Sequence, residues 1–421
     1  MTVLTPTKKG HKAAKSPFDL GAIRADFPIL AREVNGKRLV YLDNGASAQK
    51  PRAVLDTIER AYGGEYANVH RGLHYLSNLA TANFEQARET VRRFVNARSE
   101  TEIIFTRNAT EAINLVASSY GAPNIGEGDE ILLTIMEHHS NIVPWYFLRE
   151  RQGAVLKWAP VSDDGAFLLD EFERLITPRT KMIAITHMSN VLGTIVPLKE
   201  VVRIAHERGI PVLADGAQGA VHLPVDVQDL DVDFYAFTGH KLYGPTGIGV
   251  LYGKKEHLEH MRPYQGGGEM IGAVTTEAIT YAQPPHRFEA GTPAIVEAIV
   301  LGAAIDYVEG VGRERIVAHE AALLDYAMGR LGELSWLRVF GRAKGKGSIV
   351  AFNMEGAHPH DVSTILDRYG VAVRAGTHCA EPLLARFGVT ATCRASFAMY
   401  NTMEEVDTLV EALHKAREMF A

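Results

Sequence analysis

Short apolar runs recur along the first two thirds of the chain, with amphipathic stretches between them. Each run has four to six residues, which is typical of a strand that is buried on both faces of a sheet. The stretches between the runs have the apolar spacing of helices. This βα alternation predicts an α/β fold built around a mainly parallel sheet. The runs are residues 102–105, 130–135, 154–158, 182–186, 211–214, 234–237 and 248–252.

Polar residues follow several of these runs directly. In open parallel sheets, ligands bind beyond the carboxyl ends of the strands. We therefore expect these residues to meet in one site. They are Thr110, His138, residues 187–190, Asp215 and residues 238–241.

The pattern changes after about residue 293. Longer helical stretches begin at residues 294–308 and 316–331 and are followed by shorter strands and by a closing helix at residues 403–420. We expect a large domain over residues 17–293 and a smaller C-terminal α+β domain over residues 294–421.

Composition excludes several classes of function. The chain has 421 residues, 46% hydrophobic and 22% charged, with a net charge of -6. Such a balance gives no electrostatic reason to expect nucleic acid as a partner. No apolar run reaches the roughly 18 residues of a membrane span. The two cysteines, Cys379 and Cys393, favour a reducing compartment over a disulfide framework.

The first 16 residues carry four lysines and no acid, without the apolar core of a secretory signal. We interpret residues 1–16 as a disordered basic tail and expect a cytoplasmic protein. An organelle transit peptide is the alternative, although such peptides are usually longer and richer in serine and arginine.

Lys241 and Asp215 suggest a specific chemistry. Each follows an apolar run, and they are 26 positions apart. Pyridoxal phosphate needs an amine for its aldehyde and a carboxylate that keeps its ring nitrogen protonated. The pair suits both needs, although a lysine near glycines is more often a solvated loop residue.

The segments around these two residues resemble those of SufS-type, or group II, cysteine desulfurases. The resemblance is collinear from about residue 20 to the end of the chain. These enzymes belong to the class-V aminotransferase-like proteins of pyridoxal phosphate fold type I. The resemblance implies a large domain with a seven-stranded sheet, and a small domain that also receives the N-terminal segment of about 20 residues. The matching segments are residues 43–47, 68–72, 107–111, 136–139, 215–218, 239–247, 287–293, 374–380 and 393–396.

The resemblance implies roles in binding the cofactor, pyridoxal 5'-phosphate. His138 would stack on its ring and relay protons, while Asn190 and Gln218 would contact its phenolic oxygen. Donors for the phosphate would come from Ala109, Thr110, Thr238 and His240, and from Thr292 of a second subunit in a homodimer. Thr110 could instead only cap a helix, and Asn190 or Gln218 could be ordinary turn residues.

Substrate roles follow from the same resemblance. Arg394 would bind the carboxylate of L-cysteine, assisted by Arg374, His70 and Asn190, because a planar guanidinium offers two parallel donors. Cys379 would be the nucleophile that receives the sulfur, and Cys393 fits a buried inert thiol better. Thr377 departs from the family pattern, in which a histidine is common at this position.

The implied reaction removes sulfur from L-cysteine through an aldimine of the cofactor. It gives L-alanine and a persulfide on Cys379, which passes to an acceptor of the SufE or SufU kind and a Suf scaffold for iron-sulfur cluster assembly. His360 resembles the histidine offered to the zinc of a SufU-type partner, or it is a plain surface residue. We expect no metal bound by this chain itself. Selenocysteine lyase, another carbon-sulfur lyase or aminotransferase, and a cofactor-bearing scaffold are the alternatives.

Overall fold

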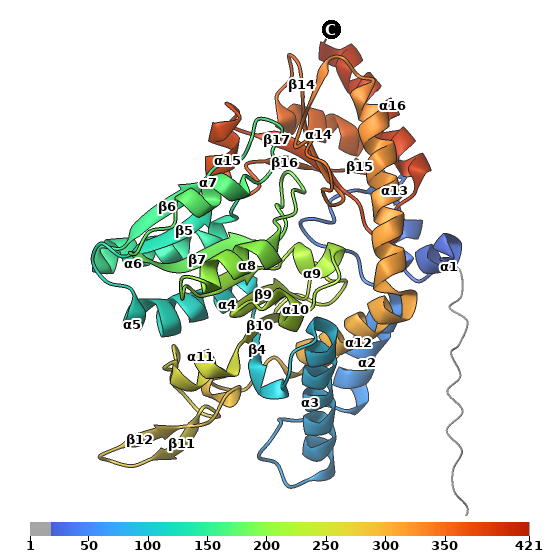
Figure 1. The fold of residues 1–421 in the computed structure, drawn as a ribbon. Coiled ribbons are helices and arrows are strands. Elements are labelled where there is room, and N and C mark those ends of the chain that lie inside the picture. The colour runs from blue at the N-terminus through green and yellow to red at the C-terminus, as the bar shows by residue number, and fades with distance from the viewer. Residues whose placement is uncertain (1–17, 421) are drawn as a thin grey trace, which may run out of the picture.

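The structure is a computed structural model that describes residues 18–420 of the 421. The predicted basic tail, residues 1–16, lies outside the described residues. The chain forms a large seven-stranded sheet with helices on both faces, and a four-stranded sheet nearer the C-terminus (Figure 1). The predicted seven-stranded, mainly parallel sheet with a C-terminal α+β unit is confirmed.

The large sheet has the strand order β4-β10-β9-β8-β7-β5-β6. Only β10 runs antiparallel, and it pairs with β9 and β4. Both ends of each strand lie within two residues of the predicted run. The strands are β4 (Ile103–Thr106), β5 (Glu130–Thr134), β6 (Val155–Ala159), β7 (Thr180–Thr186), β8 (Val212–Asp215), β9 (Phe234–Thr238) and β10 (Gly249–Gly253).

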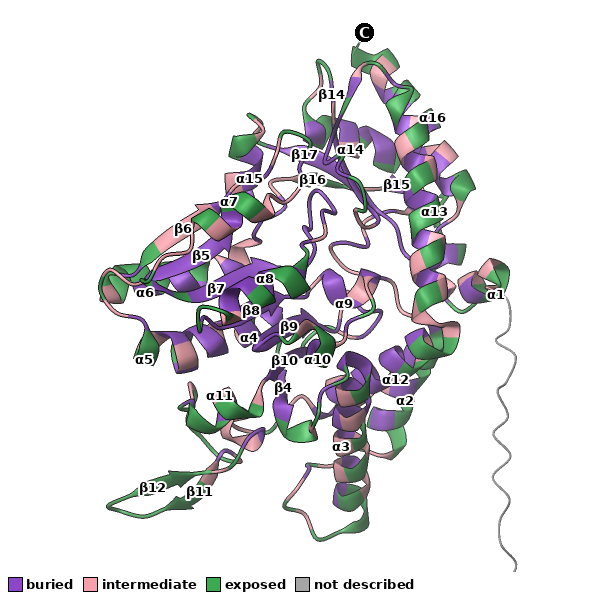
Figure 2. Ribbon diagram, in the orientation of Figure 1, coloured by how far each residue is buried: buried purple, intermediate pink, exposed green. Residues whose placement is uncertain are grey.

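Alternate side chains of these strands enter two different apolar cores. In β5, Leu132 joins one core, whereas Ile131 and Leu133 join the other. Successive side chains of a strand point to opposite faces, so both faces of the sheet are covered. The central strands are therefore buried along their whole length (Figure 2).

The helices that cover the large sheet come from both halves of the chain. The long helix α12 packs on α2 and α3. The helices on the two faces of the sheet and between its strands are α2 (Arg52–Gly64), α3 (Tyr75–Val95), α4 (Ala109–Val116), α5 (Ala122–Asn124), α6 (Val143–Gln152), α7 (Leu169–Arg174), α8 (Leu198–His206), α9 (Gly219–His222), α10 (Val227–Leu230), α11 (Lys255–His260) and α12 (Ile295–Val311).

The second sheet is antiparallel, with the order β13-β14-β17-β16. Its apolar face packs on helices in a separate core (Figure 2). Its elements are β13 (Leu337–Phe340), β14 (Ile349–Met354), β16 (Arg374–Gly376) and β17 (Thr392–Ser396), with α13 (Arg313–Gly332), α14 (Pro359–Arg368), α15 (Glu381–Arg386) and α16 (Met403–Phe420).

The N-terminal segment lies against this second unit. The strand β3 (Val40–Tyr41) pairs in parallel with β15 (Val371–Ala372). Arg24, in α1 (Leu20–Ala25), forms an ion pair of 2.9 Å with Glu405 of α16, and both side chains are almost buried. The segment after β3 is thereby held at the junction of the two sheets.

Two short hairpins complete the fold, and only one of them projects from the large unit. The hairpin of β11 (Ile271–Val274) and β12 (Ile279–Tyr281) extends away from the sheet (Figure 1), and β1 (Glu33–Val34) pairs with β2 (Lys37–Arg38). No helix among residues 18–420 combines the length and the apolar character that crossing a membrane requires.

Candidate active site

A cavity of about 260 Å³ lies beyond the carboxyl ends of the large sheet's parallel strands, and the second sheet supplies its other wall. Most of the residues predicted from the sequence line this one cavity. They are Ala109, Thr110, His138, Asn190, Asp215, Gln218, Thr238, His240, Lys241, Arg374, Cys379 and Arg394.

Lys241 and Asp215 come from neighbouring strands. Asp215 ends β8, and Lys241 lies in the tight turn that follows β9, which is paired with β8. Burial lowers the pKa of the Lys241 amine to about 8, with Asp215 opposing and Arg394 adding to the shift. Burial also raises the pKa of the Asp215 carboxyl. An amine and a carboxylate therefore meet in surroundings where water is largely excluded.

Gly216 allows the chain to turn away after Asp215. A Cβ atom at this position would lie 2.1 Å from the ring of Tyr235. The turn also lets the backbone N–H of Ala217 donate to Asp215 Oδ1 over 2.9 Å. This close packing fixes the carboxylate at the floor of the cavity.

His138 lies on a turn that two other segments anchor. Its Nδ1 accepts a hydrogen bond from the backbone N–H of Ser140 over 3.1 Å. The preceding Glu137 is fully buried and accepts from the backbone N–H of Thr186 over 3.0 Å. Burial, with the charge of Lys241, lowers the pKa of His138 to about 3. The imidazole is therefore neutral near pH 7.

Cys379 is exposed at the edge of the cavity in a strained loop. His378 and Cys379 have φ angles of 52° and 54°, which side chains other than glycine seldom adopt. Two hydrogen bonds hold the loop: Asn190 Nδ2 donates to the His378 carbonyl, and the His139 N–H donates to the Cys379 carbonyl, each over 2.8 Å. The thiol is thus fixed beside the turn that carries His138.

The helix α4 begins at the opposite end of the cavity. Asn108 caps it by accepting from the N–H of Glu111 over 2.9 Å, and Thr110 Oγ1 lies 2.6 Å from Ser140 Oγ. The alternative that Thr110 only caps the helix is therefore wrong, because Asn108 is the cap and Thr110 lies in the first turn, where it lines the cavity. Backbone amides at such a helix start favour an anion.

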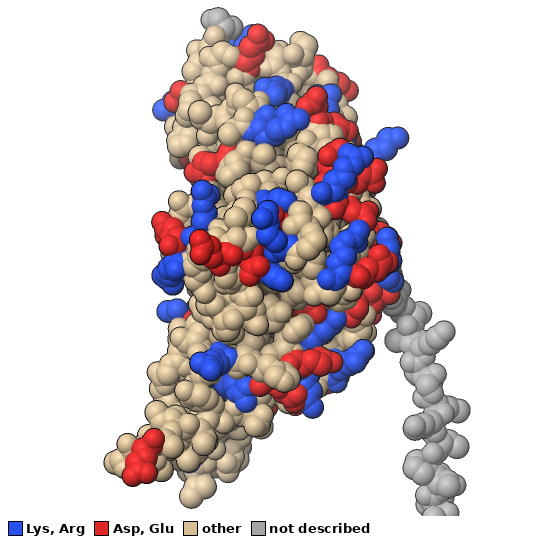
Figure 3. Space-filling view, turned by 60° about the vertical axis from the view of Figure 1, so that its left-hand side comes forward, with Lys and Arg blue, Asp and Glu red and all other residues tan. Residues whose placement is uncertain are grey.

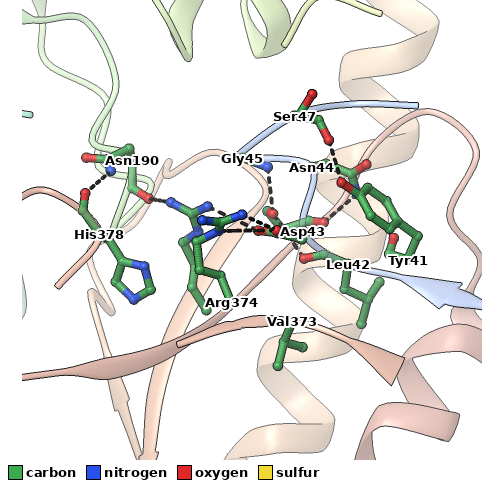
Figure 4. A network of polar contacts seen from close by, with 12 residues as sticks. Tyr41, Leu42, Asp43, Asn44, Gly45, Ser47, Asn190, Val373, Arg374 and His378 are labelled. Atoms are coloured by element: carbon green, nitrogen blue, oxygen red, sulfur yellow. Dashed lines mark hydrogen bonds and ion pairs between the residues drawn. The ribbon is translucent and has the colours of Figure 1, made fainter. Parts of the chain in front are cut away.

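Arg374 and Arg394 lie opposite each other on β16 and β17. Asp43 accepts from Arg374 Nε over 3.0 Å and from Arg374 Nη2 over 2.8 Å (Figure 4). It also lies 3.4 Å from Arg394 Nη2. Arg394 Nη1 also donates to the Asn190 carbonyl over 2.9 Å. Burial lowers the pKa of Arg394 to about 10, although Asp43 opposes this shift.

Three predicted residues lie outside this cavity. His70 Nε2 lies 2.9 Å from Glu85 Oε1, and Thr292 is exposed. His360 is exposed at the start of α14, where its Nε2 would be 4.0 Å from a Cβ atom on Gly376. His360 is therefore beside the loop that carries Cys379, whereas His70 and Thr292 are not part of this chain's own cavity lining.

Sequence reasoning assigned no role to several residues of the site. Asp43 is the most important, because it joins both arginines. The motif around residue 43 was the available signal, but nothing in it indicates a partner 331 positions away. Other such residues, all in the cavity lining, are Gly45, Ser140 and Thr186.

The donors present suit the cofactor that the sequence predicts. Lys241 offers an amine, Asp215 a buried carboxylate and the start of α4 backbone donors, within one cavity. Arg394 Nε is buried without a hydrogen-bond partner among the described residues, so a donor remains for a bound acid group. Among residues 18–420 no group of three or more His, Cys, Asp or Glu side chains is arranged to hold a metal ion.

The family model and the relatives that match this chain indicate the same family. Residues 40–409 match the family model described as aminotransferase class-V. A protein named probable cysteine desulfurase from Halalkalibacterium halodurans is 54% identical over 398 residues, which cover 94% of this chain and 98% of the relative. A cysteine desulfurase from Salmonella gallinarum is 52% identical over 403 residues, covering 96% of this chain and 99% of the relative.

A solved structure agrees with these relatives. The crystal structure of the cysteine desulfurase CsdA (S-sulfonic acid) from Escherichia coli superposes with a TM-score of 0.89 at 42% identity. The match covers 96% of this chain and 100% of that chain.

Proposed function

We propose that this chain, which belongs to the class-V aminotransferase family and is a pyridoxal-phosphate-dependent cysteine desulfurase, keeps the sulfur of L-cysteine as a persulfide on Cys379 and delivers it to an acceptor protein. The observation that carries this proposal is that Lys241 and Cys379 line the same cavity. An aminotransferase with the same fold has no need of a thiol at this place.

Substrate binding is assigned to the arginine side of the cavity. Arg394 would receive the carboxylate of L-cysteine, since its guanidinium is almost fully buried and its Nε has no other partner among the described residues. A charge-assisted hydrogen bond in such surroundings is worth roughly 1.5–3 kcal/mol. The substrate is thereby oriented with its sulfur toward the loop of Cys379.

We assign removal of the substrate's α-proton to Lys241, and stacking against the cofactor ring to His138. Pyridoxal phosphate, when bound, supplies an electron-withdrawing ring that stabilises the charge left on the α-carbon. The Lys241 Nζ would attach the cofactor and then take the α-proton, for which an amine with a pKa of about 8 is well suited. The neutral His138 ring would stack over the cofactor, where Asp215, Asn190 and Gln218 would bind its polar atoms.

The remaining cofactor contacts concern its phosphate. Ala109 and Thr110 lie at the first turn of α4, and Thr238 and His240 flank the end of β9. We assign the phosphate to these four residues, all of which line the cavity.

The sulfur transfer is assigned to Cys379. Its Sγ would attack the sulfur of the substrate, so that an S–S bond forms while the substrate's C–S bond breaks. The electron pair of that bond goes to the substrate carbon, which takes up a proton. The balance is one L-cysteine and one thiol to one L-alanine and one persulfide. The exposed position of Cys379 leaves the persulfide open to an acceptor.

The acceptor is proposed from the resemblance to SufS-type enzymes. A SufE- or SufU-type protein would dock over Cys379 and pass the sulfur to a Suf scaffold for iron-sulfur clusters. The exposed His360 is our candidate contact to a zinc-containing acceptor, because it lies beside Gly376 near the same loop.

A homodimer is proposed from exposed apolar surface and from the residues outside the cavity. Leu73 and Tyr75 are 99% and 77% exposed, and the projecting β11–β12 hairpin carries almost no charge in Figure 3. Contiguous exposed apolar patches mark interaction surfaces. In a dimer, Thr292 would reach the cofactor phosphate of the other subunit, and His70 would approach its substrate.

The reaction is tested by the alanine formed from L-cysteine, with and without SufE- and SufU-type acceptors. We expect Cys379→Ala to lower alanine formation by at least a hundredfold, while Cys393→Ala, which removes the buried thiol, keeps it within about threefold. If Cys379→Ala forms alanine at the full rate, the assignment of Cys379 as the nucleophile is wrong. If that variant still cleaves L-selenocysteine, the same cavity also serves as a selenocysteine lyase.

A further inference from the structure

The structure assigns a selective role to Asp43: we propose that its ion pair with Arg374 reduces the positive charge offered to ligands and restricts the cavity to amino acids with one carboxylate. The inference rests on the proposed function, because it takes Arg394 as the receptor of the substrate carboxylate. Asp43 would thus determine specificity without taking part in the reaction itself.

Two arginines converge on the cavity. Arg374 and Arg394 face each other across the antiparallel pair β16–β17, and both line the cavity. Two guanidinium groups at one site would together suit a ligand with two carboxylates. A cysteine desulfurase needs only one of these contacts, because its substrate has one carboxylate.

Asp43 contacts Arg374 more closely than Arg394. Its carboxylate makes a two-point contact with Arg374, at 3.0 Å to Nε and 2.8 Å to Nη2 (Figure 4). With Arg394 it makes a single long contact of 3.4 Å. The position of Asp43 is fixed by the pairing of β3 with β15 and by a bridge between Asp43 and Ser396. The carboxylate is therefore held on Arg374.

The free donors lie on the other arginine. Arg394 is 2% exposed, and its Nε has no partner among the described residues, whereas the Arg374 side chain is 50% exposed. A buried charged donor without a partner costs free energy until a ligand satisfies it. Arg394 thus favours a carboxylate strongly, while the charge of Arg374 is already offset.

L-Aspartate is the natural probe of this arrangement. It differs from L-cysteine by a carboxylate in place of the thiol. In the wild type this second carboxylate would meet Asp43 and an Arg374 that is already paired. A neutral side chain at position 43 would remove the repulsion and release Arg374 for the ligand.

The test compares L-aspartate with L-alanine, which has a single carboxylate, as competitive inhibitors of the holoenzyme. The variants are Asp43→Asn, Arg374→Ala and the double variant. The quantity measured is the ratio of the affinity for L-aspartate to the affinity for L-alanine. We expect Asp43→Asn to raise this ratio by about tenfold. Adding Arg374→Ala should cancel this gain, whereas Arg374→Ala alone should change the ratio by less than about twofold. An unchanged ratio in Asp43→Asn, or equal effects of Arg374→Ala in both backgrounds, would overturn the proposal.

Two controls separate charge selection from general damage. Asp163→Asn makes the same charge change at a 95% exposed side chain paired with Arg386, and should leave the ratio unchanged. Asp43→Ser, a second neutral variant, must shift the ratio in the same direction as Asp43→Asn. Dissociation constants from the cofactor's absorbance need no turnover. Absence of alanine formation by the wild type would therefore refute the proposed function, but the affinities for L-aspartate and L-alanine could still be compared.

Discussion

The amine of Lys241 has an unusual environment for a lysine. It lies beside one buried carboxylate, Asp215, but also near the cationic Arg394, and burial exceeds the effect of the carboxylate. A lysine in water would be almost wholly protonated at neutral pH and a poor nucleophile. The fold thus lowers the pKa of this amine before the cofactor binds.

This environment predicts how the apoenzyme captures its cofactor. With a pKa of about 8, about a quarter of Lys241 is neutral at pH 7.5, against roughly a thousandth for an unperturbed lysine. The rate of cofactor attachment, followed by absorbance, should rise with pH and level off above about pH 8. A rate that continues to rise to pH 10.5 would contradict the assigned environment, and Lys241→Ala should show no attachment.

Some residues of the site could be predicted from the sequence, and others could not. Asp215 and Lys241 follow apolar runs, so the rule for parallel sheets places them together. Asp43 lies 331 residues from Arg374, just after the short strand β3, and is held by a bridge to Ser396 of β17. Neither periodicity nor local spacing carries information about such long-range pairing.

The same limit applies to whole elements. The apolar runs gave the positions of all seven strands, because burial on both faces leaves a continuous signal. They did not give the direction of β10, because an apolar run reads alike in either direction. The helix α3 was not predicted. The hairpin β11–β12 was also missed, because it is a short pair of strands whose apolar side chains, such as Val274 and Ile279, are exposed and join no core.

The contact between β10 and the start of α4 yields a second prediction. A Cβ atom on Gly249 would lie 2.4 Å from the backbone of Asn108, which caps α4 next to Thr110. Gly249→Ala must therefore displace a backbone segment, and we expect it to cost about 2–4 kcal/mol in thermal or denaturant unfolding. The shift should also weaken cofactor affinity, measured by equilibrium titration.

The matched control is Gly63→Ala. Gly63 lies in the helix α2, where an added Cβ meets no atom within 4 Å. This change should be neutral or stabilise the protein by up to about 1 kcal/mol. Equal destabilisation by the two variants would show that the close approach at Gly249 has no special role.

A third prediction concerns the loop that joins β13 to β14. Lys346 donates to the Gly341 carbonyl over 2.8 Å and lies close to Gly193, in the segment after β7 that also carries Asn190. Burial lowers the pKa of this amine to about 7. Between about pH 7 and 10.5 the unfolded chain therefore binds more protons at this lysine than the folded chain, and its contribution to stability rises with pH.

Lys346→Met should remove that rise. We expect the variant to be more stable than the wild type by about 1–2 kcal/mol at pH 6, after allowing for partial exposure, with the difference shrinking toward pH 10. Denaturant unfolding across this pH range measures it. Lys344→Met, which changes an exposed neighbour, should leave the two curves parallel, and parallel curves for Lys346→Met would contradict the prediction.

At the scale of the whole molecule, both units of the chain are needed to complete the cavity. The large sheet supplies Lys241 and Asp215, and the second sheet supplies Arg374 and Arg394. The N-terminal segment adds Gly45 and Ala46 to the lining and is itself attached to the C-terminal helix through the Arg24–Glu405 ion pair. We therefore propose that the two predicted domains act as one catalytic unit, and that neither binds substrate alone.

The proposed dimer extends this dependence to a second chain. Thr292 is exposed and does not line the cavity of its own chain. If it serves the partner's cofactor, Thr292→Ala should weaken cofactor affinity by about tenfold, the cost of one hydrogen bond to a charged group. That result alone does not identify which subunit's site is affected.

A mixed dimer decides this point. One chain carries Lys241→Ala and the other Thr292→Ala, with different affinity tags so that the mixed species can be purified. Only the Thr292→Ala chain keeps Lys241, and its site faces an intact Thr292 if the residue crosses the interface. The cofactor dependence of L-cysteine turnover should then return to that of the wild type, with half the maximal rate. If the dependence stays as weak as in the Thr292→Ala homodimer, Thr292 acts within its own subunit, and the crossing of this residue between subunits is wrong.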